Sequence, residues 1–225
     1  MSDRLIAYID GFNLYRGMRD SRMNGLLWLN LYALAQILCP KNAHVVAVKY
    51  VTARILNLTY KSHPDYAGGE ASRKRQSEYI EALASRGVKV FEGKYKLRPS
   101  KCRSCGAKWT KPEEKASDVH LATQLLCDAF RGEFDIAMIV SGDADVTPAI
   151  RVVVDELKLP VTVAFPPKRV LNELKTVATS CKHINRHHLG KSQLPDEFEH
   201  EGHVFKRPAK WTSPKKAANI GKTAK

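Results

Sequence analysis

The sequence predicts an α/β fold in which helices flank a mostly parallel central sheet of about five or six strands. One observation behind this is the short unbroken apolar run at residues 136–140, IAMIV, which is typical of a strand buried on both faces. Strands of this kind belong to parallel sheets covered by helices. A second observation is that strand-like and helix-like segments alternate along the chain, which is the pattern of βα units.

The elements can be placed in chain order from their apolar patterns and their end signals. Strands are expected at residues 5–9, 44–52, 88–97, 136–140 and 159–165. Helices are expected at residues 26–38, 70–86, 112–130 and 147–154. Pro112 and Pro148 suit the first turns of the last two helices, because the N–H that proline lacks has no partner there. Gly87 follows the second helix, as glycine often does.

The chain has 225 residues, which is enough for one sizeable α/β domain with a tail. We expect residues 1–190 to form the domain and residues 191–225 to form a basic, partly disordered extension rich in lysine, alanine and glycine. No apolar run reaches the length of a membrane helix, and the amino terminus lacks a signal-peptide pattern. These features predict a cytoplasmic protein without a membrane partner. The five cysteines, an odd number, do not suggest a secreted disulfide framework.

Basic residues are concentrated in two stretches of a chain whose formal net charge is +14. Residues 86–111 hold nine basic residues and one acid, and residues 203–225 hold seven basic residues and no acid, so the rest of the chain is nearly neutral. Clustered lysine and arginine most often meet phosphate backbones. For the carboxyl-terminal stretch we favour a role in solubility, because lysine-rich termini are common.

Two acids, Asp143 and Asp145, follow the apolar run at 136–140. Open α/β sheets bind ligands at the carboxyl ends of their strands, which is where these acids are expected. Either acid could cap the following helix, but two carboxylates this close repel each other unless a proton or a cation lies between them. An Asp-x-Asp loop after a strand also resembles the nucleophile loop of aspartyl-phosphate phosphatases. That loop normally begins its fold, whereas this one lies late in the chain.

Asp10 and Asp118 are further candidates for the same acidic site. Asp10 ends the first strand in the same way, although Asp-Gly is also a common turn signal. Asp118 shares the apolar line of the helix at 112–130 with Ala122, Leu125 and Ala129, and an acid on a buried face needs a partner. The alternative is an outward-facing charge that stabilises the helix dipole.

Cys102 and Cys105, in the string CRSCG, have the spacing of half a zinc site. A complete site would need Cys181, a histidine such as His63 or His183, or a second subunit. The alternative is a reduced turn or a redox pair.

Taken together, these motifs resemble the NYN domain family, a branch of the PIN-like, LabA-like nuclease superfamily. The matching strings are YIDGFNLY at 8–15, CRSCG at 102–106, EEKASDVHLATQLL at 113–126 and SGDADVTPAI at 141–150. The resemblance continues through LPD at 194–196 to RPAKW at 207–211. It departs from the family where members commonly carry serine in place of Ala144 and often an acid in place of Gln124.

The resemblance implies a PIN-like three-layer sandwich with a catalytic domain at residues 1–190 and a basic CxxC-containing insertion near 94–111. It implies that Asp10, Asp118, Asp143 and Asp145 hold Mg²⁺ or Mn²⁺ and catalyse phosphodiester hydrolysis. Asn13, Ser141 and Thr147 would fix the carboxylates or touch the substrate. The backbone of the nucleic acid would be held by basic residues, namely Lys94, Lys96, Arg98, Lys101, Arg103, Lys108 and Lys115.

The function implied in this way is that of a metal-dependent ribonuclease acting on RNA. Three alternatives stay open: a non-catalytic RNA-binding protein of the same fold, a DNA nuclease, and an aspartyl-phosphate phosphatase. Zn²⁺ at Cys102 and Cys105 is a further expected cofactor. A homodimer is compatible with the sequence but is not indicated by it.

Overall fold

The computed structural model describes residues 2–55 and 66–212. Its central sheet has seven strands in the order β4-β3-β2-β1-β5-β6-β7. Six of these strands are parallel, and β4 alone runs antiparallel, to β3. This confirms the predicted α/β fold with a mostly parallel sheet. The strands are β1 (Asp3–Asp10), β2 (Ala43–Ala53), β3 (Lys89–Lys101), β4 (Lys108–Lys115), β5 (Ile136–Val140), β6 (Val161–Phe165) and β7 (Ser180–His183).

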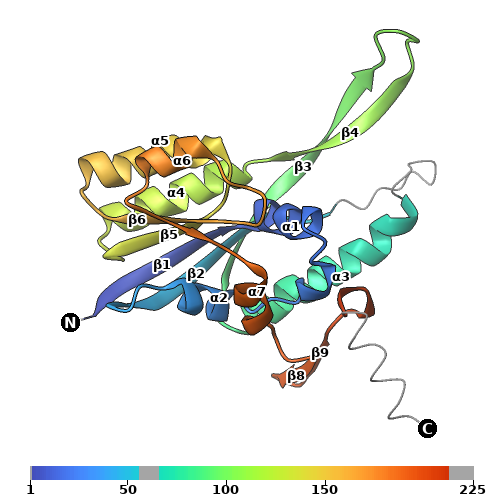
Figure 1. The fold of residues 1–225 in the computed structure, drawn as a ribbon. Coiled ribbons are helices and arrows are strands. Elements are labelled where there is room, and N and C mark those ends of the chain that lie inside the picture. Colours follow the sequence, from blue (N-terminus) through green and yellow to red (C-terminus); the bar gives the residue numbers. More distant parts are fainter. Residues whose placement is uncertain (1, 56–65, 213–225) are drawn as a thin grey trace.

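Helices cover both faces of the sheet (Figure 1). On one face lie α1 (Gly11–Asp20), α2 (Leu31–Leu38), α3 (Tyr66–Ala84) and α7 (Arg186–Lys191). On the other lie α4 (Ser117–Phe130), α5 (Thr147–Arg151), which continues as one π-helical turn at Val152–Glu156, and α6 (Asn172–Val177). Short 3₁₀ turns occur at Asn24–Leu26, Ala144–Val146 and Ala209–Trp211.

The sheet separates two hydrophobic cores, because neighbouring residues of a strand point to opposite faces. In β1, Leu5, Ala7 and Ile9 pack under α1, α2 and α3, whereas Ile6 and Tyr8 pack under α4 and α5. All five residues are almost completely buried. A central strand with both faces covered must be apolar at every position, which explains the unbroken runs in β1 and β5.

The helix predicted at residues 112–130 is wrong in its first turn. Residues 108–115 form β4 instead and pair with residues 94–101, so that Pro112 lies opposite Leu97. Proline is tolerated in β4 because this is an edge strand, in which alternate N–H groups face away from the neighbouring strand and make no ladder bond. Ala116 then adopts a left-handed backbone conformation, with φ at 74°, and turns the chain into α4, which begins at Ser117.

The part of the carboxyl-terminal extension up to residue 212 packs against the domain. Ser192, Leu194 and Phe205 are buried, and the hairpin of β8 (Glu197–His200) and β9 (His203–Lys206) lies next to α3 in Figure 1. Trp211 completes an aromatic cluster, with its ring centroid 5.6 Å from that of Tyr79. Residues 213–225 lie outside the described residues, so the predicted disorder and the boundary at 190 stay predictions. None of the described helices is long and apolar enough to span a bilayer.

Candidate functional site

Asp10 lies at the carboxyl end of β1, and its carboxylate is held on both sides. The Oδ1 atom accepts a hydrogen bond of 2.9 Å from the backbone N–H of Asn13, so Asp10 caps α1. The Oδ2 atom accepts one of 2.9 Å from the hydroxyl of Ser141. Only 8% of the residue is exposed. The Asp-Gly pair therefore marks the start of a helix. The carboxylate that caps this helix is buried, and it also accepts a hydrogen bond from Ser141, which follows the neighbouring strand β5.

The loop after β5 is tied to the start of α1 by one further hydrogen bond, and a second one lies within the loop. The backbone N–H of Gly142 donates to Oδ1 of Asn13 at 3.1 Å. The backbone N–H of Asp143 donates to the hydroxyl oxygen of Ser141 at 3.1 Å. Asn13 and Ser141, both predicted to fix the carboxylates, thus link the ends of β1 and β5 into one rigid network around Asp10.

Burial raises the pKa of Asp10 to about 7. The hydrogen bonds from Asn13 and Ser141 oppose this rise, because they stabilise the ionised form. The negative charges of Asp118 and Asp143 add to the rise. A carboxylate with two like charges around it and almost no solvent favours a proton or a cation as its partner.

The remaining predicted residues surround Asp10 in different ways. Asp118 stands half-buried in the first turn of α4, and Asp143 caps the 3₁₀ turn at Ala144–Val146 by accepting from the N–H of Asp145 at 3.2 Å. Asp145 is exposed on that turn and is not among the charges that raise the pKa of Asp10. Three of the four predicted acids are therefore electrostatically coupled, and Asp145 lies at the margin.

Thr147 carries an unpaired hydroxyl. The residue is 3% exposed, and its Oγ1 atom has no hydrogen-bond partner within the described residues. A buried hydroxyl normally has a hydrogen-bond partner, so this one is an exception to the otherwise paired network around Asp10.

These residues fit a hard cation in their chemistry. Carboxylate oxygens are the preferred ligands of Mg²⁺ and Mn²⁺, and Asp10 needs a positive partner when it is ionised. Among residues 2–55 and 66–212, however, no three His, Cys, Asp or Glu side chains are grouped closely enough to hold a metal ion. A shared ion would therefore require the side chains of Asp118 and Asp143 to turn toward Asp10.

Gly142 is required by its surroundings, because a Cβ atom there would overlap with the carbonyl oxygen of Arg169. We expect Gly142→Ala to destabilise the protein by about 3 kcal/mol, since a backbone atom cannot move aside as a flexible side chain can. Gly190→Ala in α7 is the matched control, because a Cβ atom there meets no atom within 4 Å. Urea unfolding of both variants tests this, and equal midpoints would contradict it.

The basic residues of the insertion lie on a two-stranded ribbon. Strands β3 and β4 continue beyond the domain and form the long green hairpin that projects from it in Figure 1. The side chains of Lys94, Arg98, Lys101, Arg103 and Lys108 are exposed, and so is Trp109. Lys96 and Lys115 belong to the ribbon, but their side chains lie outside the described part. The ribbon is therefore a basic arm with an exposed ring.

Cys102 and Cys105 form the turn at the tip of this ribbon. The backbone N–H groups of Cys105 and Ser104 lower the pKa of the Cys102 thiol, as is usual in a Cys-X-X-Cys motif. Cys181 and His183, named above as completing ligands, are wrong for this role because β7 lies at the opposite edge of the sheet from β4. His63 lies outside the described residues. Zn²⁺ at this turn stays a prediction.

A buried polar cluster under α4 was not predicted. The Nζ atom of Lys49 lies 2.7 Å from Oδ2 of Asp128 and donates to Oε1 of Gln124 at 2.7 Å. The hydroxyl of Tyr8 donates to Asp128 at 2.6 Å. Gln124 thus serves as a neutral partner of Lys49. The signal for this cluster was a lysine within the otherwise apolar strand HVVAVKYV.

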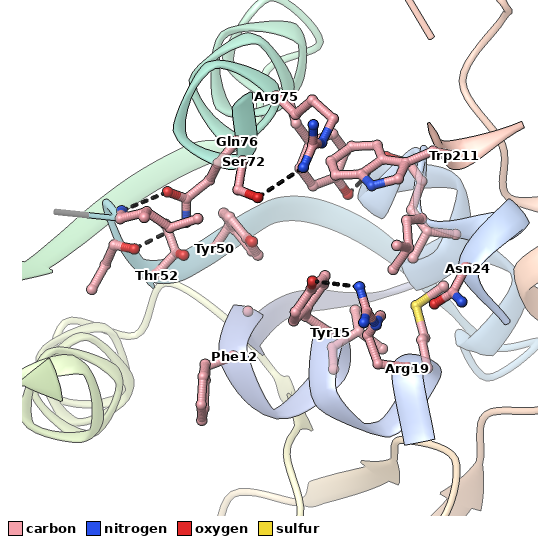
Figure 2. Close-up of a pocket in the computed structure, with 18 of the residues that line it drawn as sticks. Phe12, Tyr15, Arg19, Asn24, Tyr50, Thr52, Ser72, Arg75, Gln76 and Trp211 are labelled. Carbon is pink, nitrogen blue, oxygen red and sulfur yellow. Dashed lines mark hydrogen bonds between the residues drawn. The ribbon is translucent and has the colours of Figure 1, made fainter. Parts of the chain in front are cut away.

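A cavity of about 330 Å³ opens beside Asp10, on the side of α1 that faces α3. Figure 2 shows Tyr15 and Arg19 of α1 on one wall, Arg75 of α3 on the opposite wall, and Trp211 at one end. Gly11, the residue after Asp10, is part of the lining. Asp10 and the other three acids are not part of the lining, so the cavity is a neighbour of the acidic site and not a part of it.

Fold and site together define an α/β protein with coupled acids at the carboxyl ends of adjacent parallel strands. The family model of the NYN domain matches residues 4–185, so the chain belongs to the NYN domain family. This confirms the resemblance stated from the sequence, and membership of this family suggests a nuclease of the PIN-like superfamily.

Two other comparisons extend this result. Over 221 residues the chain is 27% identical to the 6-hydroxy-3-succinoylpyridine 3-monooxygenase HspA of Pseudomonas putida, a match that covers 85% of this chain and 68% of the relative. A protein of unknown function from Vibrio parahaemolyticus has a similar solved structure, with a TM-score of 0.53 and 18% identity. That match covers 82% of this chain and 94% of the other, and it supports the fold alone.

Proposed function

We propose that the protein is a metal-dependent ribonuclease that hydrolyses phosphodiester bonds at the acidic site around Asp10. The observation that carries this proposal is the buried carboxylate of Asp10, whose pKa is raised to about 7 by burial, with the charges of Asp118 and Asp143 adding to the rise. Strongly perturbed carboxylates at the carboxyl edge of a parallel sheet are typical of a site that binds a charged ligand.

Each residue has a distinct role in this proposal. Asp10, Asp118 and Asp143 would hold Mg²⁺ or Mn²⁺, with Asp145 contributing from the margin. When bound, such an ion activates water and neutralises charge on the phosphate. Asn13 and Ser141 fix the orientation of Asp10 through the hydrogen bonds described above, and Thr147, whose hydroxyl is buried, would support the loop that carries Asp143 and would not contact the substrate. The basic ribbon would hold the RNA backbone, which gives affinity with little sequence preference.

The proposal is tested with end-labelled single-stranded RNA, double-stranded RNA and single-stranded DNA, each incubated with the protein and Mn²⁺, Mg²⁺ or a chelator. We expect RNA cleavage that the chelator abolishes. Tight RNA binding without cleavage would favour the non-catalytic alternative. Cleavage of DNA alone would identify a DNA nuclease, and turnover of small phosphate esters would identify a phosphatase.

The role of the ribbon gives a prediction about salt. Replacing Arg98, Lys101 and Lys108 with glutamine should weaken binding of single-stranded RNA of any sequence. The slope of log K against log salt should fall by about 2, because each lost phosphate contact contributes about 0.7. A control variant with the same loss of charge replaces Arg131, Lys158 and Lys191, which are exposed away from the ribbon. Equal slopes for the two variants would contradict a role for the ribbon.

The name of the Pseudomonas relative supplies a second candidate, which is oxygenation of an aromatic acid. The cavity beside Asp10 favours it, because aromatic rings and arginines suit an aromatic ring that carries a carboxylate. Calorimetric titration with 6-hydroxy-3-succinoylpyridine tests this candidate. A saturable heat signal that is lost in an Arg19→Gln variant would support it, and the absence of any signal at millimolar concentrations would exclude that compound.

A further inference from the structure

The cavity beside Asp10 combines two kinds of side chain that seldom share one pocket. Its lining is rich in aromatic rings, and all three of its ionisable side chains other than tyrosine are basic. No carboxylate is part of the lining, and none in the described chain forms an ion pair with these three residues. The aromatic residues are Phe12, Tyr15, Tyr50, Tyr79, Tyr95 and Trp211, and the basic ones are Arg19, Arg75 and Lys210.

The walls of the cavity are fixed by packing. A Cβ atom at Gly11 would lie 2.5 Å from the ring of Tyr50, so this ring rests directly on the backbone that follows Asp10. Tyr79 is buried, and its ring lies at 88° to that of Trp211, with centroids 5.6 Å apart. These rings form a rigid floor and end wall. Binding a ligand therefore costs little conformational entropy, because these side chains are already ordered.

The rim, in contrast, is accessible. Tyr15 is 40% exposed, and Arg19 lies next to it, with its Nη1 atom 3.3 Å from the phenol oxygen and its Cζ atom 5.8 Å from the ring centroid. On the opposite wall, Nη2 of Arg75 donates to the hydroxyl of Ser72 at 2.8 Å, which holds this arginine in place (Figure 2). Two guanidinium groups thus flank an opening next to exposed ring surface.

We propose that this cavity binds one unpaired nucleotide of the RNA strand, with the base against the aromatic rings and a phosphate against Arg19 and Arg75. Base–aromatic stacking requires a base whose faces are uncovered, which selects single-stranded over double-stranded RNA. The volume of about 330 Å³ lies in the range of small-molecule pockets, which begins at about 300 Å³. Gly11 follows Asp10 directly in the chain, so the nucleotide would lie next to the acidic site, although none of the acids lines the cavity.

The cavity should discriminate weakly among bases. The side-chain amide of Gln76, on the α3 wall, already makes hydrogen bonds through both its nitrogen and its oxygen. Its NH₂ group donates to the carbonyl of Ala53 at 2.9 Å, and its oxygen accepts from the N–H of Ile55 at 2.8 Å. With Gln76 engaged, recognition rests mainly on the rings, which contact the face of a base, although Asn24 and Thr52 also line the cavity.

This inference deepens the proposed function and rests on it for the identity of the strand, but it can be tested without cleavage. The full-length protein is titrated in chelator with uridine 5′-monophosphate, adenosine 5′-monophosphate, inorganic phosphate and benzoate, and binding is followed by calorimetry. The test variant carries Tyr15→Ala and Arg19→Gln. The control carries Phe130→Ala and Arg131→Gln, a ring and an arginine that are exposed at the far end of α4. Unchanged melting temperatures show that both variants fold.

We expect both nucleotides to bind with similar affinity and more tightly than phosphate or benzoate. The test variant should weaken nucleotide binding by about tenfold or more, and the control should not change it. Equal weakening in both variants, no nucleotide binding at millimolar concentrations, or preference for benzoate would overturn the inference, the last pointing to a small aromatic acid instead.

The same variants separate this inference from the proposed function. If RNA is cleaved and the test variant leaves the KM for RNA unchanged, the cavity is not the nucleotide site, although the ribonuclease stands. If nucleotides bind as expected but no RNA is cleaved by the wild-type protein, the cavity stands and the ribonuclease does not.

Discussion

Replacing Asp10 with asparagine is expected to stabilise the metal-free protein at pH 9 while abolishing its activity. A pKa raised from 3.8 to about 7 corresponds to about 4 kcal/mol of unfavourable free energy for the ionised form in the folded state. Asparagine keeps the cap on α1, because its side-chain oxygen can also accept from the N–H of Asn13, but it carries no charge.

The sign of this effect follows from the direction of the pKa shift. The pKa of Asp10 is higher in the folded state than in the unfolded state. The contribution of Asp10 to the free energy of unfolding is therefore fully present below about pH 4 and is lost as the pH rises through about 7. Urea unfolding in chelator at pH 4 and pH 9 should therefore show no difference at acid pH and a large gain for Asp10→Asn at alkaline pH. Asp155→Asn, an exposed acid, is the control. A gain that does not depend on pH would contradict the explanation.

Lys49→Met is expected to destabilise the protein by about 3–5 kcal/mol, because it leaves the buried carboxylate of Asp128 without its positive partner. The side chains of Lys49 and Asp128 are only 8% and 6% exposed. Since Asp128 belongs to α4, whose first turn carries Asp118, the variant should also reduce any activity that needs Asp118.

A double-mutant cycle separates this explanation from simple loss of packing. Combining Lys49→Met with Asp128→Asn should recover much of the stability, because no unpaired charge then stays buried. Lys89→Met is a close control, since Lys89 lies beside Lys49 in the register of β2 and β3 but is exposed. Its free energy of unfolding should change by less than about 0.5 kcal/mol. Additive effects of the two changes in the cycle would contradict the role of the ion pair.

The acids of the candidate site carry local signals in the sequence. Asp10 directly follows one unbroken apolar run, Asp143 lies three residues after the end of another, and the carboxyl ends of parallel strands meet at one edge of a sheet. Asp118 was placed by the apolar line at Leu125 and Ala129, which holds even though the start of its helix was wrong. Its coupling to Asp10 required the fold, because the two residues belong to elements far apart in sequence.

The features that were missed depend on contacts between distant segments. β4 carries a proline followed by two glutamates, which is a helix-start signal, and only its pairing with β3 overrides that signal. The cavity beside Asp10 is assembled from Gly11, Tyr50, Arg75 and Trp211. No spacing in the sequence brings these four residues together, so no motif could have indicated the cavity.

The central claim is that the coupled acids around Asp10 cleave RNA, and a single-turnover assay tests it most directly. End-labelled single-stranded RNA is incubated in Mn²⁺ with the wild-type protein, with Asp143→Asn, and with Asp155→Asn as an exposed acid away from the site. The proposal predicts that Asp143→Asn slows cleavage by about 1,000-fold or more, while Asp155→Asn cleaves at the wild-type rate. Cleavage by Asp143→Asn at the wild-type rate, with its fold and RNA binding intact, would contradict the claim.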